Sequence, residues 1–183
     1  MFMIISYTYA QNDKDRYLSL SYGVDVRNAL IGSQPTDNKP ALNWTAEFHA
    51  VEENIDFNIG MERFNMLEYT RVFVGLGYHI QVLYLLNTDI KFSVHPSIEF
   101  SNINRTFNES VVWEGKTVTT EVGKSFSTPS FNINWNWDLH KNVAIQIGTN
   151  VLPRRDIQYI YKEDHMRVIV SNSLKLVYKF NNH

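Results

Sequence analysis

Apolar and polar side chains alternate along most of this 183-residue chain. In the segment YLSLSYGVDVR, Tyr17 to Arg27, every second residue from Leu18 to Val26 is apolar, and the residues between them are Ser, Gly and Asp. A repeat of two residues is typical of a β-strand whose two faces meet different surroundings. The same alternation predicts eight strands, at residues 17–27, 41–52, 55–64, 69–81, 90–102, 129–139, 143–152 and 166–180. No segment of convincing length repeats with the helical period, so we expect no helix.

Eight long alternating strands without helices predict an all-β fold, an eight-stranded antiparallel up-and-down β-barrel, because closure of the sheet removes its edges. The links between the strands mostly alternate between long and short. NALIGSQPTDNKP and the link at 153–165 are long, whereas EEN and HKN are short. This alternation is typical of a barrel that spans the bacterial outer membrane, with long loops outside and tight turns in the periplasm. The short third link, NMLE, and the longer fourth link, near LYLLNTD, depart from the rule.

The composition of the polar face indicates which side of the strands meets water. Ser, Asn, Thr and Gly dominate it, and small polar side chains suit the narrow interior of an eight-stranded barrel. Its charges have both signs and could pair inside, at Glu47, Glu62, Arg71, Lys91, Glu99, Arg167 and Lys175. The apolar face carries no charge in the centre of any strand, as a lipid-facing surface requires. The alternative is a soluble, lipocalin-like carrier of a small apolar ligand, in which the same alternation turns the apolar face inward.

Composition excludes several other classes of protein. The net charge of −2 gives no sign of a nucleic-acid partner. The chain has no cysteine, so a disulfide framework or a thiolate zinc site is impossible. No run of eighteen apolar residues is present, which excludes a transmembrane helix but not a membrane-spanning barrel. No nucleotide-binding or zinc motif is present, and we expect no cofactor.

The first ten residues, MFMIISYTYA, are apolar and uncharged and do not alternate cleanly. They end on a small-x-small pattern before the polar segment QNDKDR, which favours the remnant of a signal peptide cut after Ala10. The basic start of such a peptide is missing, and the alternative is an ordinary N-terminal strand. We therefore assign residues 1–10 to a signal peptide remnant and residues 11–183 to one barrel domain.

Three stretches carry a resemblance to a known family: VFVGLGYHI, FSVHPSIEF and LKLVYKF. They resemble the small outer-membrane β-barrel proteins of Gram-negative bacteria, the OmpA/OmpX-like group, and especially members from Bacteroidota. The final NNH is a departure from relatives that end on the aromatic residue. The resemblance implies a monomer in the bacterial outer membrane, surrounded by lipid and lipopolysaccharide, with both termini in the periplasm. It implies a structural or adhesive role through the extracellular loops, and neither an enzyme nor a pore for large solutes.

His95, Ser97 and Glu99 form the most suggestive chemical set, because a serine, a histidine and a carboxylate can make an esterase. Some outer-membrane barrels similar to this chain are lipid A deacylases with a His-x-Ser motif, so a lipid A-modifying enzyme is an alternative function. In that family Asn follows the serine and the triad faces the lipid. Here Ile98 follows, and the alternation turns the three side chains inward. We therefore predict no catalytic residue.

Three histidines share the polar face with two glutamates and could in principle hold a metal ion: His49, His79, His95, Glu47 and Glu99. They lie on different strands, and the alternation cannot place them at one height in the barrel. We therefore favour a polar, hydrogen-bonded interior and predict no metal site.

Two loops offer candidate contacts outside the membrane. In residues 103–126, Glu114-Gly115 lies between two β-rich arms and predicts the turn of an exposed hairpin. Such a ribbon could bind a protein partner by strand addition, or it could have no partner. Arg154 and Arg155 could contact lipopolysaccharide phosphates, although we favour solvated side chains.

Overall fold

The computed structural model describes residues 16–30, 42–64, 68–84, 91–162 and 164–181, and all that follows concerns these residues. They form nine strands and two short helices: β1 (Arg16–Asp25), α1 (Val26–Leu30), β2 (Asn43–Glu52), β3 (Ile55–Phe64), β4 (Tyr69–Tyr78), β5 (Ile80–Tyr84), β6 (Lys91–Trp113), β7 (Lys116–His140), β8 (Val143–Arg154), α2 (Arg155–Tyr161) and β9 (Arg167–Asn181). The predicted signal peptide, residues 1–10, lies outside the described part of the chain.

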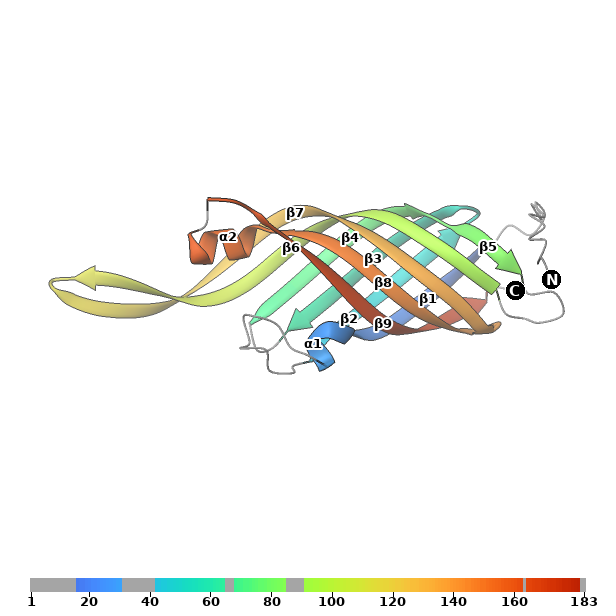
Figure 1. The fold of residues 1–183 in the computed structure, drawn as a ribbon, viewed down its shortest axis with the longest axis horizontal. Coiled ribbons are helices and arrows are strands. Elements are labelled where there is room, and N and C mark those ends of the chain that lie inside the picture. The colour runs from blue at the N-terminus through green and yellow to red at the C-terminus, as the bar shows by residue number, and fades with distance from the viewer. Residues whose placement is uncertain (1–15, 31–41, 65–67, 85–90, 163, 182–183) are drawn as a thin grey trace, which may run out of the picture.

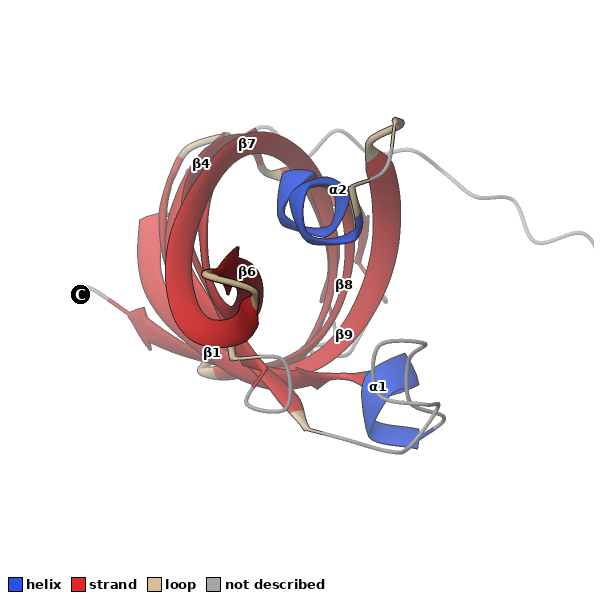
Figure 2. Cartoon of the chain, turned by 90° about the vertical axis from the view of Figure 1, so that its left-hand side faces the viewer, coloured by secondary structure: helices blue, strands red, loops and turns tan. Residues whose placement is uncertain are grey.

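The strands form one antiparallel sheet that closes on itself (Figure 2). Consecutive strands pair with each other except β4 and β5, β9 pairs with β1, and β4 pairs with β6 to complete the ring. The predicted strand at 69–81 is divided at His79 into β4 and β5, and both parts pair with β6. The ring therefore has eight strands, and the predicted antiparallel barrel is confirmed.

The alternation places polar side chains inside the barrel and apolar side chains outside. In β1, Ser19 and Ser21 are buried, whereas Leu20 is 49% and Tyr22 is 57% exposed. The other strands follow the same rule, and buried Asn132 and Asn134 in β7 are flanked by outward-facing Phe131 and Trp135. This orientation confirms the prediction that the apolar face points outward, and it is the opposite of what the lipocalin-like alternative requires.

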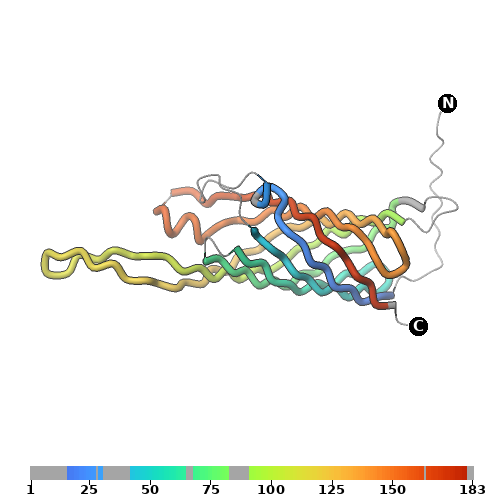
Figure 3. The backbone as a smooth tube through the Cα atoms, turned by 90° about the horizontal axis from the view of Figure 1, so that it is seen from below, coloured from blue at the N-terminus to red at the C-terminus, as the bar shows by residue number. Residues whose placement is uncertain are grey.

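The two ends of the barrel differ (Figures 1 and 3). One end, here called the turn end, carries the first residues of β1, the last residues of β9 and the tight turns of the β2–β3 and β7–β8 hairpins. The other end, here called the loop end, carries α1, α2 and a long hairpin formed by β6 and β7. The long connections therefore lie at the loop end, as the sequence predicts, but the short link between Phe64 and Tyr69 lies at the same end and is the departure that the sequence shows.

The β6–β7 hairpin extends far past the barrel (Figure 1). Its pairing is continuous from Lys91 with Asp138 to Trp113 with Lys116. Glu114 and Gly115 form its turn, with φ angles of 48° and 75°. Two successive residues with positive φ are typical of the tight turns that match the twist of a β-ribbon. The predicted turn and the exposed ribbon, here residues 107–122, are both confirmed.

The prediction that the chain has no helix is wrong. β1 ends at Asp25, and Val26 and Arg27, predicted as strand, begin α1 instead. As a consequence β1 pairs with β9 only as far as Asp25 with Ser173, although β9 begins six residues earlier, at Arg167. The link at 153–165 contains α2. Among the described residues, no helix is long and apolar enough to cross a membrane.

Candidate functional site

A line of charged and polar side chains fills the half of the barrel interior nearer the turn end. The Lys175 Nζ donates to Glu47 Oε1 at 2.6 Å, and His49 Nε2 donates to Glu47 Oε2 at 3.1 Å. Asp56 continues the line, since its carboxylate accepts from His49 Nδ1 at 3.0 Å and from His95 Nδ1 at 2.8 Å. All five side chains are buried.

The geometry sets the protonation of the two histidines. Each ring nitrogen of His49 faces a carboxylate, so both carry a proton and the ring is an imidazolium. His95 donates one proton to Asp56, and its Nε2 accepts from His79 Nδ1 at 2.8 Å and from the Asn136 amide at 3.0 Å. His95 is therefore neutral. Two cations, Lys175 and His49, balance the two carboxylates of the line.

Arg71 organises a second cluster toward the loop end. Its guanidinium pairs with the Glu99 carboxylate and, at 3.2 Å, with Glu62 Oε2. It also donates to the hydroxyl oxygens of Ser101 at 2.8 Å and Ser130 at 3.1 Å. The guanidinium is thus bonded in several directions, as a charge that has left water requires.

Glycines on the inner face make room for these side chains. A Cβ atom on Gly75 would lie 2.2 Å from Asn58 Oδ1 and 2.8 Å from Glu99 Cγ. A Cβ atom on Gly148 would lie 3.0 Å from Lys175 Nζ. Side chains from the two neighbouring strands therefore lie over each of these glycines, and the interior there is packed rather than open.

In the structure His95, Ser97 and Glu99 bond to other residues rather than to one another, and Ser97 and Glu99 share Asn58. His95 uses both ring nitrogens on Asp56, His79, Ser93 and Asn136. Ser97 accepts a long 3.5 Å hydrogen bond from Asn58, and Glu99 pairs with Arg71. All three side chains lie inside the barrel, as the alternation predicts. A relay from serine through histidine to carboxylate is not assembled in this arrangement.

The candidate metal ligands are only partly brought together. Glu47, His49, His79 and His95 belong to one hydrogen-bonded line, but Glu99 lies in the Arg71 cluster. In the part of the chain that the structure describes, no three His, Asp or Glu side chains are arranged to hold a metal ion. Asp56, which links the two histidines, was missed by the sequence reasoning. The only sequence feature that could have identified Asp56 is its place on the polar face of β3, the strand that follows His49.

At the loop end, Asp156 of α2 is fully buried between two arginines. Arg105 Nη1 donates to Asp156 Oδ2 at 3.1 Å, and Arg154 donates to both carboxylate oxygens, at 2.7 Å and 2.5 Å. Burial raises the pKa of Asp156, but the hydrogen bonds and charges of Arg154 and Arg105 outweigh burial and hold the pKa below its ordinary value. The sequence reasoning missed Asp156, because the strand pattern ends before it.

The two loop arginines behave differently from each other. Arg154 is buried against Asp156, with its guanidinium 4.5 Å from the centre of the Tyr69 ring, so the prediction of a solvated side chain is wrong for it. Arg155 is exposed, as expected. Beneath them an apolar layer of Phe64, Tyr69, Ile103 and Leu152 covers the polar interior.

α2 lies across part of the loop-end mouth and packs against the base of the ribbon (Figure 2). Tyr159 lies 5.7 Å from Phe107 and 5.6 Å from Phe126, measured between ring centres. The Lys124 ammonium lies over the Tyr159 ring at 3.8 Å. Asp156 anchors the helix in the barrel, and Tyr159, about one turn further along the helix, contacts the hairpin.

Comparisons with known proteins identify the fold. No family model and no curated protein matches the sequence. Among solved structures, the N-terminal β-barrel domain of Pseudomonas aeruginosa OprF superposes with a TM-score of 0.57 and 6% sequence identity, over 92% of this chain and all of that domain. Neisserial surface protein A gives a TM-score of 0.49 at 10% identity, over 91% of this chain and 97% of that one. The Yersinia pestis outer membrane protein Ail gives 0.44 at 9% identity, over 91% of this chain and 100% of that one.

The chain therefore has the fold of the small eight-stranded outer-membrane β-barrels, as the resemblance implies. The narrower resemblance to proteins of Bacteroidota stays a prediction.

Replacing Arg71 by Leu tests the buried pairing. The variant leaves Glu99 and Glu62 without their cation, so we expect the free energy of unfolding to fall by about 3–5 kcal/mol. Urea titration of the protein in phospholipid vesicles measures the change. In the double variant Arg71→Leu with Glu99→Gln, part of the loss returns because one unpaired charge is gone. A loss below about 1 kcal/mol would mean that water reaches the cluster.

Asp156→Asn tests the attachment of α2 through its pH dependence. Because the folded-state pKa of Asp156 is lowered, its contribution is complete above the ordinary value of 3.8 and is lost as the pH falls through the folded-state value. We expect wild type to be more stable than the variant at pH 7, and the difference in free energy of unfolding to close on acidification. A difference that stays constant down to the lowest pH would contradict the pairing.

Proposed function

We propose that the chain is an integral protein of the bacterial outer membrane whose filled barrel holds an adhesive β-ribbon outside the cell. In this arrangement the turn end lies in the periplasm and the loop end faces the medium, as in barrels of this architecture. The β6–β7 ribbon binds another protein through its apolar face. The barrel serves as the anchor and does not pass large solutes.

The outer surface of the barrel supports insertion in a membrane. Leu20, Ile59 and Val74 are 49%, 47% and 41% exposed, and they lie near the middle of their strands. Such a surface in water would be a large apolar patch, whereas in lipid it is favourable. Aromatic pairs border it, with Phe92 stacked on Trp135 toward the turn end and Tyr22 on Trp44 toward the loop end. Aromatic residues at both borders are typical of membrane-spanning barrels.

The interior supports an anchor rather than a channel. The line from Lys175 to His79 and the Arg71 cluster occupy the bore with side chains that bond to one another. The Phe64 and Tyr69 layer and α2 follow at the loop end. Interior side chains fill a barrel of eight strands, and this leaves no path for a large solute.

The observation that carries the adhesive role is the two-faced character of the ribbon. Opposed residues of β6 and β7 share a face, and most of the apolar residues lie on one face, which carries Phe107, Val111, Trp113, Val118 and Val122 beside Glu109, Lys116 and Thr120. The opposite face carries Asn108, Ser110, Thr117, Thr119 and Glu121 with one apolar residue, Val112, and the Ser110 and Thr119 hydroxyls lie 3.3 Å apart. At the base α2 covers the apolar face through Tyr159 and Phe107.

Beyond α2 the same face is exposed to solvent. Val111, Trp113 and Val118 are 52%, 69% and 48% exposed. A two-stranded ribbon has little stability of its own, and an exposed apolar face at its tip favours binding to another protein surface. The support by α2 holds the ribbon out from the barrel and so lowers the entropy lost on binding.

Val74→Arg tests the membrane location. We expect the free energy of unfolding in phospholipid vesicles to fall by about 2–4 kcal/mol, because the charge enters the hydrocarbon near its centre. Val112→Arg is the control, since Val112 is 72% exposed on the ribbon, outside the membrane, and should change stability little. Equal effects at the two positions, or folding of the wild-type chain in plain buffer without lipid or detergent, would contradict the proposal.

Replacing Val111 and Val118 by Ser tests the ribbon. We expect bacteria that express this double variant to lose most of their attachment to protein-coated surfaces and to neighbouring cells, relative to wild type. Thr117→Ser with Thr119→Ser, on the opposite face, is the matched control and should attach normally. Both variants should keep the mobility of the folded barrel on gels without boiling. Normal attachment by the Val111 and Val118 variant would overturn the adhesive role.

A further inference from the structure

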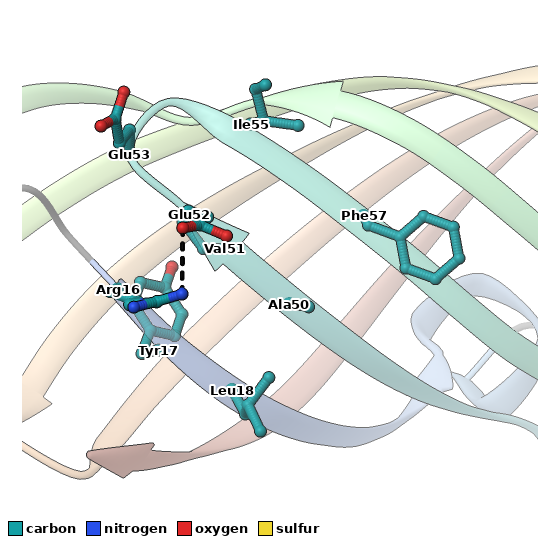
Figure 4. A pocket seen from close by; sticks show the side chains of 9 residues that line it. All are labelled: Arg16, Tyr17, Leu18, Ala50, Val51, Glu52, Glu53, Ile55 and Phe57. Carbon is teal, nitrogen blue, oxygen red and sulfur yellow. Dashed lines mark ion pairs between the residues drawn. The ribbon is translucent and has the colours of Figure 1, made fainter. Parts of the chain in front are cut away.

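A groove of about 600 Å³ runs along the outer wall at the turn end (Figure 4). Its floor is Ala50 of β2, the smallest outward side chain in its row. The walls are Leu18 of β1 and Phe57 of β3, which pair with Ala50 on either side. The next outward residue of β2 is Phe48, 37% exposed, which ends the groove toward the centre of the barrel.

The other end of the groove is charged. Arg16 Nη2 lies 3.0 Å from Glu52 Oε1, and the two side chains are 70% and 69% exposed. Glu53, in the following turn, also lines this end (Figure 4). The groove thus runs from a charged rim beyond the last strand residues onto the apolar outer surface, and no side chain of the described residues fills it.

The surroundings determine what can occupy the groove. If the barrel spans a membrane, as proposed above, its turn-end border meets lipid headgroups and Ala50 meets hydrocarbon. Leu18, Phe57 and Ile55 then offer an apolar channel of acyl-chain character, and Arg16, Glu52 and Glu53 offer one cation and two carboxylates at its mouth.

We propose that this groove binds one glycerophospholipid whose headgroup carries a phosphate and a primary ammonium. One acyl chain lies over Ala50 between Leu18 and Phe57. The Arg16 guanidinium donates to the phosphate, and the Glu52 and Glu53 carboxylates accept from the ammonium. This proposal rests on the membrane location proposed above and is independent of the ribbon.

The charge pattern separates this lipid from the other common ones. Phosphatidylglycerol presents a phosphate without an ammonium, so its headgroup offers no charged N–H donor to Glu52 and Glu53. Phosphatidylcholine carries an ammonium without N–H donors, so it gives up the hydrogen bonds to Glu52 and Glu53. Phosphatidylethanolamine satisfies both signs, and we use it as the probe.

Filling the groove tests the acyl-chain site. The full chain is purified in detergent and mixed with phosphatidylethanolamine, and native mass spectrometry counts bound lipid. We expect Ala50→Leu to reduce the population with one bound lipid at least about tenfold, an effect on binding equal to about 1.4 kcal/mol. Ala46→Leu is the matched control, because Ala46 is the other small outward residue of β2, between Tyr22 and Met61, and lies outside the groove. It should bind lipid as wild type does.

Reversing the rim charge tests the headgroup. In wild type we expect phosphatidylethanolamine to compete successfully against an equal amount of phosphatidylglycerol. Glu52→Lys places a second cation beside Arg16 and should invert the preference. Ala50→Leu, Ala46→Leu and Glu52→Lys should all keep the gel mobility that the folded barrel shows without boiling. A change in lipid binding then does not reflect misfolding.

Three results would overturn the inference: equal lipid binding by Ala50→Leu and wild type, equal reductions by Ala50→Leu and Ala46→Leu, or an unchanged headgroup preference in Glu52→Lys. A wild-type dimer that Ala50→Leu dissociates would show that a second copy of the chain occupies the groove instead. Insertion into vesicles without lipid selectivity would sink this inference alone, whereas failure to insert would also sink the membrane proposal.

Discussion

The bore of an eight-stranded barrel is only wide enough for side chains, and the charges inside it must find partners there. This limit explains the composition of the inner face. Lys175 reaches Glu47 across the barrel, and Arg71 reaches Glu62 and Glu99. Glycines stand where two such side chains meet, because even a methyl group would collide with them. The interior is consequently mostly polar, with an apolar layer toward the loop end, and most of the apolar residues lie on the outside.

The pairing inside the barrel also fixes what lies beyond it. Asp156, tied to Arg105 and Arg154, anchors α2 in the mouth, and Tyr159 on the same helix contacts the base of the ribbon through Phe107. A chain of contacts thus runs from the charged core to the exposed hairpin. The ribbon is set at a defined angle to the wall, although only two of the eight strands continue into it.

The sequence predicts those features that depend on local pattern. Alternation identifies the strands and their faces, and Glu114-Gly115 identifies the hairpin turn, since each is encoded by adjacent residues. The sequence pattern does not predict α2, because its seven residues make fewer than two helical turns and so show no helical period. The hydrogen-bond partners of His95 could not be predicted from the sequence for another reason. Parity places His95, Ser97 and Glu99 on one face, but the height at which Asp56 and Arg71 meet them depends on the stagger between strands, which no local pattern encodes.

The pairing of β1 with β9 joins the two ends of the chain, from Tyr17 with Asn181 to Asp25 with Ser173. These contacts join residues that are far apart in the sequence, so forming them costs more loop-closure entropy than forming a hairpin. We therefore expect them to form after the local hairpins. Closure of the ring must therefore wait until β9 is available. Until then the growing sheet carries two unpaired edges, which are prone to join the wrong strand. The time between the arrival of β8 and the docking of β9 is the interval in which this chain most needs a chaperone.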